Sequence, residues 1–449
     1  MDGEHYPPVV RATLDEIASG GDEIVAALLA GGREKLPAGG VDAYGDVRVL
    51  QGEDPLRVLD GFLTTNPVDA VLDLSDEPVL GYRNRHRFAA VSLYRGVEYR
   101  GADFTFSPPP RPRVARKPTI AVIGTGKRTG KTAVCGFTAR ALVAGGYKPV
   151  IVAMGRGGPP EPDVVRGDQI ELTPRDLLKL VEDEKHAASD YIEDAILGRV
   201  PTVGCRRCGG GLAGGVDHSN VAAGVEIANE LPGDLILLEG SGASIPPVHA
   251  DVTVLVVPAS VDPEYLAGYM GPYRLLLADF GVVTMCENPF GSPSQISSLS
   301  SLIRSAFRSA DHEGSEEEIH LVRTVFRPTP TSSVDGASVF VATTAPEEVG
   351  ESIRRHLEDD HGCRVTGMSH ALADRSRLEQ DMQGLAEKAT TLLVEIKAAG
   401  IDVATRKALD AGLEVVYMDN TPHGIEGEDP ADLVTAAADL AVRRFEATP

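Results

Sequence analysis

The stretch AVIGTGKRTGKTAV, from Ala121 to Val134, constrains the fold more than any other part of the sequence. An apolar run precedes glycines and cations, and a helical pattern follows, so a strand, a loop and a helix are expected in this order. The stretch fits the end of the pattern G-x-x-x-x-G-K-[ST] at Gly130, Lys131 and Thr132. Thr125 replaces the first glycine, which makes the loop a variant. The alternative is a glycine turn that binds nothing.

This loop is expected to wrap the phosphates of a nucleotide. Its glycines let backbone N–H groups approach phosphate oxygens, and the following helix adds unpaired N–H groups and a positive dipole end. Lys131 is expected to reach the β- and γ-phosphates, and Lys127 and Arg128 to contact the γ-phosphate or the acceptor. The candidate nucleotide contacts are Gly124, Thr125, Gly126, Lys127, Arg128, Thr129, Gly130, Lys131 and Thr132.

A magnesium ion at this nucleotide needs a second protein ligand besides the Thr132 hydroxyl. Such ligands are carboxylates at the ends of buried strands. Glu239 follows the apolar residues Leu235–Leu238 and enters a glycine loop. An unpaired carboxylate there is costly, so Thr132 and Glu239 are the candidate metal ligands. The alternative is a strand-end Glu239 that merely faces solvent.

The apolar runs around the loop predict a parallel sheet, because they are continuous rather than alternating. They are Thr119–Gly126, Lys148–Gly158, Gly233–Gly242, Asp251–Ser260 and Phe280–Asn288. The predicted fold class is α/β: a P-loop NTPase core with a parallel sheet, an N-terminal α/β domain and a C-terminal α/β region. The predicted boundaries are residues 1–106, a proline-rich linker at 107–118, the core at 119–310 and the last region at 311–449.

The flanking regions show weaker patterns. Helices are expected at Val9–Ala18, Asp22–Leu29 and Leu56–Leu63, and strands at Val68–Ser75, Arg87–Tyr94 and Val97–Phe106. The opening DGEHYPP resembles a loop that follows a strand, although no strand precedes it. A helix is expected within Ser292–Ser309 and a loop at Asp311–Glu318. Four further strands alternate with helices after that, which is βαβ order.

The charge balance excludes some partners. The formal net charge is −23, and general nucleic-acid binding needs a basic face, so no nucleic acid is expected. No apolar run of about 18 residues exists, so no membrane partner is expected. The acidic N-terminus lacks a signal-peptide core, which predicts a cytoplasmic location. Polyanionic ligands would require cations concentrated locally, as in GKRTGK, GRGGPPEPDVVRGD and CRRC.

Cys205 and Cys208 form a C-x-x-C within five cysteines, an odd number that argues against a disulfide framework. A structural zinc site takes two such pairs or added histidines. His218 is a candidate third ligand, with no obvious fourth. The alternative is a tight glycine-rich loop that happens to hold two thiols. If the C-x-x-C binds a metal, a second class of function is favoured, a P-loop regulatory or metal-delivery NTPase.

Two resemblances extend this interpretation. GTGKRTGKT, GYKPVIV and LLEGSG resemble the dethiobiotin synthetase group over roughly Thr119–Asn288, which implies ATP, Mg²⁺ and activation of an oxyanion by phosphorylation. DGEHYPPVV, AMGRGGPPEPDVV, CGGGLAGG and EGSGASIPPV resemble the cyclic 2,3-diphosphoglycerate synthetase family. That family implies ATP-driven closure of 2,3-bisphosphoglycerate into an internal pyrophosphate, release of ADP and phosphate, and a homodimer. Another ATP-dependent kinase or ligase is the remaining alternative.

Such a substrate demands dense positive charge beside the nucleotide. Arginine suits phosphate because its fork binds two oxygens at once. The expected catalytic residues are Lys131, Lys127 and Arg156, and the expected substrate contacts are Arg156, Arg166, Arg206, Arg207 and His218. For Arg206, Arg207 and His218 a structural role is as plausible as a functional one. Strand-end residues are expected to shape a cleft between the second and third regions: Asp217, Lys397, Asp402 and Asp419.

Overall fold

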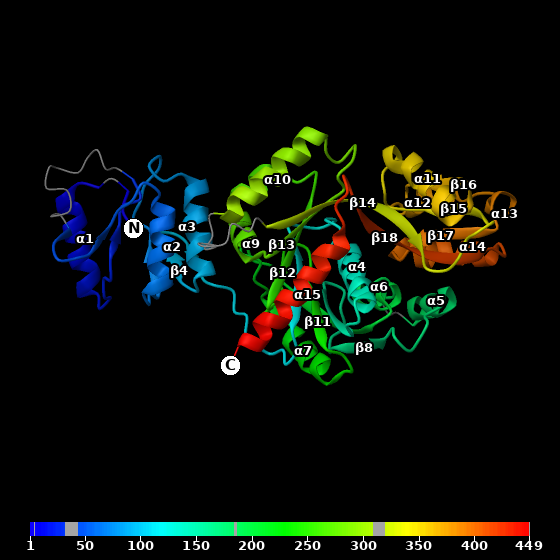
Figure 1. Cartoon of the computed structure of the whole chain (residues 1–449), viewed down its shortest axis with the longest axis horizontal. Coiled ribbons are helices and arrows are strands. Elements are labelled where there is room, and N and C mark those ends of the chain that lie inside the picture. The colour runs from blue at the N-terminus through cyan, green and yellow to red at the C-terminus, as the bar shows by residue number, and fades with distance from the viewer. Residues whose placement is uncertain (4, 32–43, 184–185, 309–318, 449) are drawn as a thin grey trace.

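The computed structural model describes residues 1–448 apart from residues 4, 32–43, 184–185 and 309–318. Most of these residues are organised around one 13-stranded sheet, and two small sheets belong to the N-terminal part. Figure 1 shows an elongated molecule with the N-terminal part at one end and β15–β17 at the other. None of the helices in the described part of the chain is long and apolar enough to cross a membrane.

The N-terminal part is a small α/β unit. Strands β1 and β2 pair in parallel, as do β3 and β4. The first two residues join these pairs, because Asp2 bridges Leu29 and the Leu74 N–H donates to the Met1 carbonyl. The start of DGEHYPP therefore pairs with the short strands of this unit itself. The elements are α1 (Pro7–Ser19), β1 (Ala27–Leu28), β2 (Val49–Leu50), α2 (Pro55–Thr65), β3 (Ala70–Leu72), α3 (Tyr82–Tyr94), β4 (Glu98–Arg100) and β5 (Thr105–Phe106).

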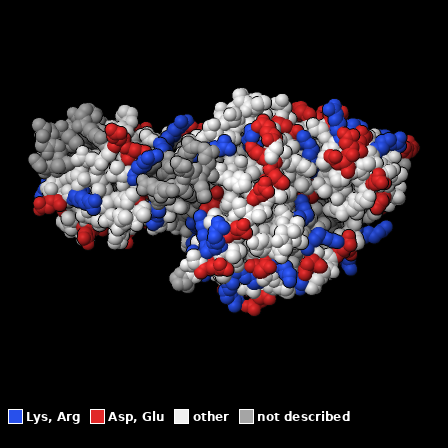
Figure 2. All heavy atoms as spheres, in the orientation of Figure 1, with Lys and Arg blue, Asp and Glu red and all other residues white. Residues whose placement is uncertain are grey.

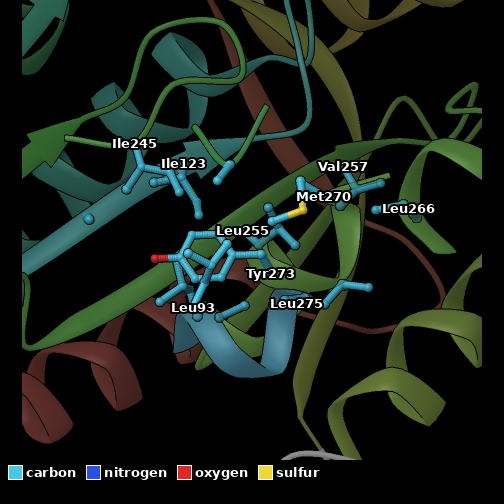
Figure 3. Packing of buried hydrophobic residues seen from close by; sticks show 14 of the residues in the cluster. Leu93, Ile123, Ile245, Leu255, Val257, Leu266, Met270, Tyr273 and Leu275 are labelled. Carbon is cyan, nitrogen blue, oxygen red and sulfur yellow. The ribbon is translucent and has the colours of Figure 1, made fainter. Parts of the chain in front are cut away.

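Two predictions for this part are wrong. The segment Asp22–Leu29 contains the short strand β1 and no helix, and Arg87–Tyr94 is the second half of helix α3 rather than a strand. Helix α3 packs against α2 and β4 on one side and against α9 (Gly271–Leu277) on the other. Figure 3 shows Leu93 of α3 beside Tyr273 and Leu275. Because the helix is covered on both sides, its apolar residues do not follow the usual helical stripe.

The core forms as predicted, after a linker at residues 107–118 that holds no helix or strand. Parallel strands lie in the order β9-β7-β11-β6-β12-β13. Their carboxyl ends meet at one edge, where ligands of such sheets bind. The elements are β6 (Thr119–Gly124), α4 (Lys131–Ala144), β7 (Pro149–Gly155), β8 (Asp163–Arg166), α5 (Pro174–Glu182), α6 (Asp190–Gly198), β9 (Pro201–Cys208), β10 (His218–Ser219), α7 (Val221–Glu230), β11 (Leu235–Glu239), β12 (Val252–Pro258), α8 (Pro263–Ala267), α9, β13 (Phe280–Thr284) and α10 (Pro293–Arg308).

The sheet continues beyond the core through one long strand, β14 (His320–Pro330). Its first part pairs with β13 in parallel, and its second part pairs with β18 in antiparallel fashion. The predicted loop at Asp311–Glu318 lies outside the described residues. The further elements are β15 (Ser338–Ala342), η3 (Glu347–Val349), α11 (Gly350–His361), β16 (Arg364–Ser369), α12 (Arg375–Asp381), α13 (Leu385–Lys388), β17 (Thr391–Glu395), η4 (Gly400–Thr405), α14 (Arg406–Asp410), β18 (Glu414–Gly424) and α15 (Pro430–Ala447).

The last helix returns to the core. Helix α15 packs on β6 and β12 beside α4, and its buried residues join the same apolar cluster as those strands. In Figure 1 this red helix crosses in front of the core strands. The chain therefore leaves the core along β14, builds the strands β15–β18 and comes back, so that two chain segments connect the core with the C-terminal strands.

Candidate active site

Lys131, which follows the loop between β6 and α4, folds its side chain back onto that loop. Lys131 is 7% exposed, and its Nζ donates to the Gly126 carbonyl at 2.7 Å and to Thr129 Oγ1 at 3.2 Å. A side chain at Gly124 would put its Cβ 2.8 Å from Lys131 Cδ, so the lysine stem needs glycine there. The Thr284 hydroxyl of β13 donates to the Thr129 carbonyl at 2.8 Å, which ties the loop to the sheet.

A carboxylate lies beside this lysine at the end of β11. Glu239 is 1% exposed, and β11 lies between β6 and β7. Burial lowers the pKa of Lys131 to about 8, opposed by the charges of Glu239 and Asp190. Burial and the charge of Asp190 raise the pKa of Glu239 to about 8, opposed by a hydrogen bond from Thr132. Thr132 and Glu239, the two residues expected to hold a metal, are thus neighbours.

The carboxyl group of Glu239 has unmet bonding capacity. Its Oε2 is buried and accepts no hydrogen bond from any described residue, and the same holds for both side-chain oxygens of Asp194. Burial, and then the neighbouring Glu239, raise the pKa of Asp194 well above its usual value. An orphaned carboxylate oxygen beside a threonine hydroxyl matches the oxygen ligands that Mg²⁺ takes. The donor set of Thr132 and Glu239 therefore fits a magnesium ion.

The loop opens into a cavity of about 540 Å³ between the core and the C-terminal strands. Besides Lys131, three cations line its core side: Lys127, Arg128 and Arg156. All three are exposed, and none forms an ion pair with a described residue. On the face drawn in Figure 2, by contrast, acidic and basic side chains are intermingled. Cations without ion-pair partners beside a phosphate-binding loop, in a strongly acidic protein, make this cavity a candidate anion site.

The opposite wall of the cavity comes from the C-terminal strands. Lys397 follows β17 and donates to both oxygens of Glu193 of α6, at 2.8 and 2.7 Å. Asp419 of β18 accepts from Arg140 of α4 at 2.5 Å. These ion pairs join the two walls. The structure places Lys397 and Asp419 in the cavity lining, as the sequence suggested, but neither Asp217 nor Asp402.

Arg207 of β9 packs against the glycine loop that follows Glu239. It donates to the Ser241 carbonyl at 2.9 Å and to the Gly209 carbonyl at 3.1 Å. Its Nε is buried without a partner among the described residues. Burial, and then the charge of Arg156, lower its pKa. Arg207 therefore supports the floor of the anion site beside Arg156.

The other sequence candidates lie elsewhere. Arg206 donates to the Pro160 carbonyl at 2.9 Å and thereby holds the loop that carries Arg156. Arg166 pairs with Asp168 at 2.6 Å, and it lies opposite Pro201, at the amino end of β9. That is the end of the sheet away from the phosphate loop, so the structure does not bring Arg166 to the cavity. The His218 side chain is 74% exposed and is absent from the cavity lining.

The C-x-x-C lies on strand β9 rather than in a loop. Cys205 is buried and Cys208 is exposed, and burial raises the pKa of Cys205 to about 12. His218, on the neighbouring strand β10, lies directly opposite Cys208. Within the described residues, no group of three or more His, Cys, Asp or Glu side chains is arranged to hold a metal ion. This geometry gives no support to a metal-delivery role.

Sequence reasoning missed several residues of the site. Asp190 and Glu193 reach the cavity from the first turn of α6, and Glu395 reaches it from the end of β17. The pattern SDYIED, with an N-cap serine and acids three apart, was a signal for a charged helix end. Arg274 is 3% exposed and donates to the Ala243 carbonyl at 2.6 Å and the Leu212 carbonyl at 3.3 Å. It thus joins two glycine loops. Because these loops lie far from Arg274 in the sequence, no local sequence pattern indicates this role.

Fold and site together define a P-loop enzyme with a composite anion cavity. Three family models of cyclic 2,3-diphosphoglycerate synthetase match the chain: the N-terminal domain at residues 1–107, the P-loop domain at 119–313 and the C-terminal domain at 330–421. The chain belongs to the cyclic 2,3-diphosphoglycerate synthetase family. The resemblance and the P-loop α/β core predicted from the sequence are therefore confirmed, and the P-loop domain supports nucleotide binding.

Curated relatives agree with this assignment. A protein of Rubrobacter xylanophilus named cyclic 2,3-diphosphoglycerate synthetase is 46% identical over 439 residues, covering 98% of this chain and 96% of that protein. One of Methanothermobacter thermautotrophicus with the same name is 41% identical over 455 residues, covering 99% and 96%. The solved structure of LpxK from Aquifex aeolicus in complex with ATP has a TM-score of 0.41 at 13% identity, covering 75% of this chain and 90% of that chain, a likeness too low to inform the site.

Proposed function

We propose that the enzyme uses ATP and Mg²⁺ to close 2,3-bisphosphoglycerate into cyclic 2,3-diphosphoglycerate, with release of ADP and phosphate. The name of the family supplies the product. The observation that carries the proposal for this chain is the cavity itself, where Lys127 and Arg128 of the phosphate-binding loop and the nearby Arg156 have no ion-pair partner among the described residues. The cavity volume of about 540 Å³ is in the range of small-molecule sites.

The triphosphate lies on the loop in this proposal. Backbone N–H groups of residues 124–130 and the amino end of α4 bind its oxygens, and Lys131 neutralises the β- and γ-phosphates. Thr132 and Glu239 hold Mg²⁺, which supplies positive charge to the phosphate oxygens. Lys127 and Arg128 line the cavity with exposed side chains, which contact the γ-phosphate or the acceptor.

The acceptor occupies the space between Arg156 and the C-terminal wall. The γ-phosphoryl group moves to an oxygen of one substrate phosphate, and its bond to the β-phosphate oxygen breaks to give ADP. An oxygen of the second substrate phosphate then attacks the phosphorus of the activated phosphate. The bond to the transferred phosphate breaks, inorganic phosphate leaves, and the ring closes. Arg156 and Lys397 hold the two substrate phosphates together against their repulsion, which is positioning and charge stabilisation.

Phosphorus NMR tests this proposal directly. Purified protein incubated with ATP, Mg²⁺ and 2,3-bisphosphoglycerate is expected to produce a new cyclic pyrophosphate signal together with ADP and phosphate. Omission of any one of the three should abolish the signal. ATP turnover that is the same with and without bisphosphoglycerate would contradict the proposal and favour a regulatory NTPase.

A second prediction separates the acceptor from the nucleotide. Arg156→Ala is expected to raise the KM for 2,3-bisphosphoglycerate about tenfold to a hundredfold, because a hydrogen bond to a charged group contributes about 1.5–3 kcal/mol. The Kd for ATP should change less than about threefold. Steady-state kinetics and nucleotide titration measure the two effects.

Arg166→Ala is the matched control, because Arg166 is an arginine of the same chain region that the structure keeps outside the cavity. Its KM should stay near that of the unmodified enzyme. Equal losses of acceptor and ATP affinity in Arg156→Ala, or a larger KM effect in Arg166→Ala, would show that Arg156 has been assigned wrongly. The homodimer and the cytoplasmic location expected from the sequence remain predictions.

A further inference from the structure

Arg274 of α9 is a buried cation without an acidic partner. The residue is 3% exposed, and burial lowers the pKa of its guanidinium group. Within the part of the chain that the structure describes, Arg274 forms no ion pair, and the ionisable groups that act on its pKa are Tyr265 and Tyr273. A buried charge costs free energy unless hydrogen bonds compensate it. The hydrogen bonds of Arg274 must therefore offset this cost.

Among the described residues, Arg274 donates only to backbone carbonyls. Its Nε and Nη2 donate to the Ala243 carbonyl at 3.1 and 2.6 Å. Its Nη1 and Nη2 donate to the Leu212 carbonyl, each at 3.3 Å, and Nη1 also donates to the Met270 carbonyl at 3.2 Å. Leu212 lies in the first glycine loop, residues 209–215, and Ala243 in the second, residues 240–244. Because the guanidinium fork is planar and rigid, it fixes these two loops relative to each other.

A second arginine holds the same two loops. Arg207 donates to the Gly209 carbonyl at 3.1 Å and to the Ser241 carbonyl at 2.9 Å. The Ile245 N–H, just after the second glycine loop, donates to the Gly214 carbonyl at 2.9 Å. The second glycine loop is therefore tied to the first through both arginines and through the backbone. Its first three residues line the cavity, so its shape is part of the site.

Helix α9 also packs against the N-terminal part. Tyr273 and Leu275, the two neighbours of Arg274 in the sequence, lie beside Leu93 of α3 (Figure 3). The preceding helix α8 adds the carboxylate of Glu264, which accepts hydrogen bonds from the first turn of α3. Since close-packed interiors transmit displacements, the packing of α3 helps to fix the helix that carries Arg274.

We propose that Arg274 is a positioning residue for the reaction, through which the docking of the N-terminal part on α9 sets the second glycine loop. The inference rests on the proposed function, because it needs Mg²⁺ on Glu239, where this loop begins. None of the described residues of the N-terminal part lines the cavity, so a contribution of this part to turnover within one chain runs through its contacts with the core. Without Arg274, two buried carbonyls lose their donors, and the loop shifts together with Glu239.

Substitution of Arg274 by methionine tests the proposal, because methionine keeps much of the length but donates no hydrogen bond. Arg274→Met is expected to lower kcat about a hundredfold, an effect that a displacement of about 1 Å can have. The Mg²⁺ concentration for half-maximal rate should rise about tenfold. The Kd for ATP without Mg²⁺ should change less than about threefold, because Thr284 rather than Arg274 anchors the phosphate loop. Steady-state kinetics and nucleotide titration measure these values.

Arg444→Met is the matched control. Arg444 also donates to a core carbonyl, that of Asp251, at 2.7 Å, but it does so at the amino end of β12. Its substitution should leave kcat and the Mg²⁺ requirement within about twofold of the unmodified enzyme.

Chemical rescue supplies a readout that a role in stability alone would not move. Millimolar guanidinium added to Arg274→Ala below its Tm should restore part of the lost kcat. Urea, a neutral molecule of similar shape, should not. Rescue by both compounds, or by neither, would count against a positioning role of the guanidinium group.

Leu93→Ala tests the contribution of the N-terminal part. The shorter side chain loosens the contact of α3 with α9, so the Mg²⁺ concentration for half-maximal rate should rise about threefold, with ATP binding in the absence of Mg²⁺ unchanged. Leu14→Ala is its control, because Leu14 is a buried leucine of α1 in a separate apolar cluster of the same part. Its Mg²⁺ requirement should equal that of the unmodified enzyme.

Circular dichroism checks the fold of every variant, and the two leucine variants decide the question if the Arg274 variants do not fold. A folded Arg274→Met enzyme with unchanged kcat and Mg²⁺ requirement would overturn the proposal, as would equal effects of Leu93→Ala and Leu14→Ala. An unmodified enzyme that makes no product from 2,3-bisphosphoglycerate would instead contradict the proposed function, and that outcome is distinct from the others.

Discussion

Replacing Lys131 with alanine is expected to lower kcat by about a thousandfold or more, which corresponds to about 4 kcal/mol of transition-state stabilisation. Lys131 is buried under the loop, and among the described residues its ammonium group donates to the Gly126 carbonyl and the Thr129 hydroxyl of that loop. Its ammonium group is thus held where the phosphates would lie. Phosphoryl transfer depends on charge stabilisation more than on covalent chemistry, so loss of this one charge should affect the chemical step strongly.

The fold should survive this substitution, because the strand and the helix around the loop are held by the sheet. Circular dichroism and thermal unfolding check that point. Lys148→Ala is the control, since Lys148 is an exposed lysine at the entry of β7, at the opposite end of the sheet. Turnover retained in Lys131→Ala would remove the phosphate loop from the mechanism. Loss of turnover in both variants would point to a general effect of charge.

Glu239→Gln is expected to lower turnover about a hundredfold at moderate Mg²⁺ and to raise the Mg²⁺ concentration needed for half-maximal rate. The amide has the shape of the carboxylate but lacks its charge, so it binds a cation poorly. Stability without ligands should not suffer, because the raised pKa of about 8 leaves the unliganded Glu239 carboxyl group largely neutral near pH 7, and the amide that replaces it can donate to Asp194. The Tm is therefore expected to fall by no more than about 2 °C.

Asp234→Asn is the matched control for this variant. Asp234 precedes the same strand at its amino end, where its Oδ1 accepts from the Lys148 backbone N–H at 2.8 Å, and asparagine keeps that acceptor. Rates measured across a range of Mg²⁺ concentrations distinguish the two variants. An unchanged Mg²⁺ dependence in Glu239→Gln would show that Glu239 is no metal ligand. A large drop in its Tm would show that the carboxylate is structural.

The sequence predicted those parts of the site that are formed by residues close together in the chain. The phosphate loop lies within one strand–loop–helix unit, and Glu239 follows a strand whose apolar run is unmistakable. Both signals depend on neighbours in the chain, so one sequence suffices to find them. Arg156 and Arg166 show the limit of this approach. They are ten residues apart and of one type, yet Arg166 ends strand β8, which runs antiparallel to β9 and carries it to the other end of the sheet.

The parts that the sequence did not predict depend on long-range packing. The strand prediction for Arg87–Tyr94 is wrong because helix α3 is buried on both sides, by its own domain and by α9. The C-terminal wall of the cavity follows from the pairing of β14 with β18, nearly 100 residues apart. Neither pairing nor burial between distant segments leaves a local pattern. Asp190 and Glu193 were missed for the same reason, since only the approach of β17 gives Glu193 its partner Lys397.

A crystal structure with a non-hydrolysable ATP analogue, Mg²⁺ and 2,3-bisphosphoglycerate would show whether both ligands share this site. We expect the triphosphate on the loop from Gly124 to Thr132 and the bisphosphoglycerate in the same cavity, with a phosphate on Arg156. The γ-phosphate and one acceptor phosphate should lie within reach of each other, at roughly 3–3.5 Å between the reacting atoms. A triphosphate bound anywhere else, or an acceptor outside this cavity, would contradict the account.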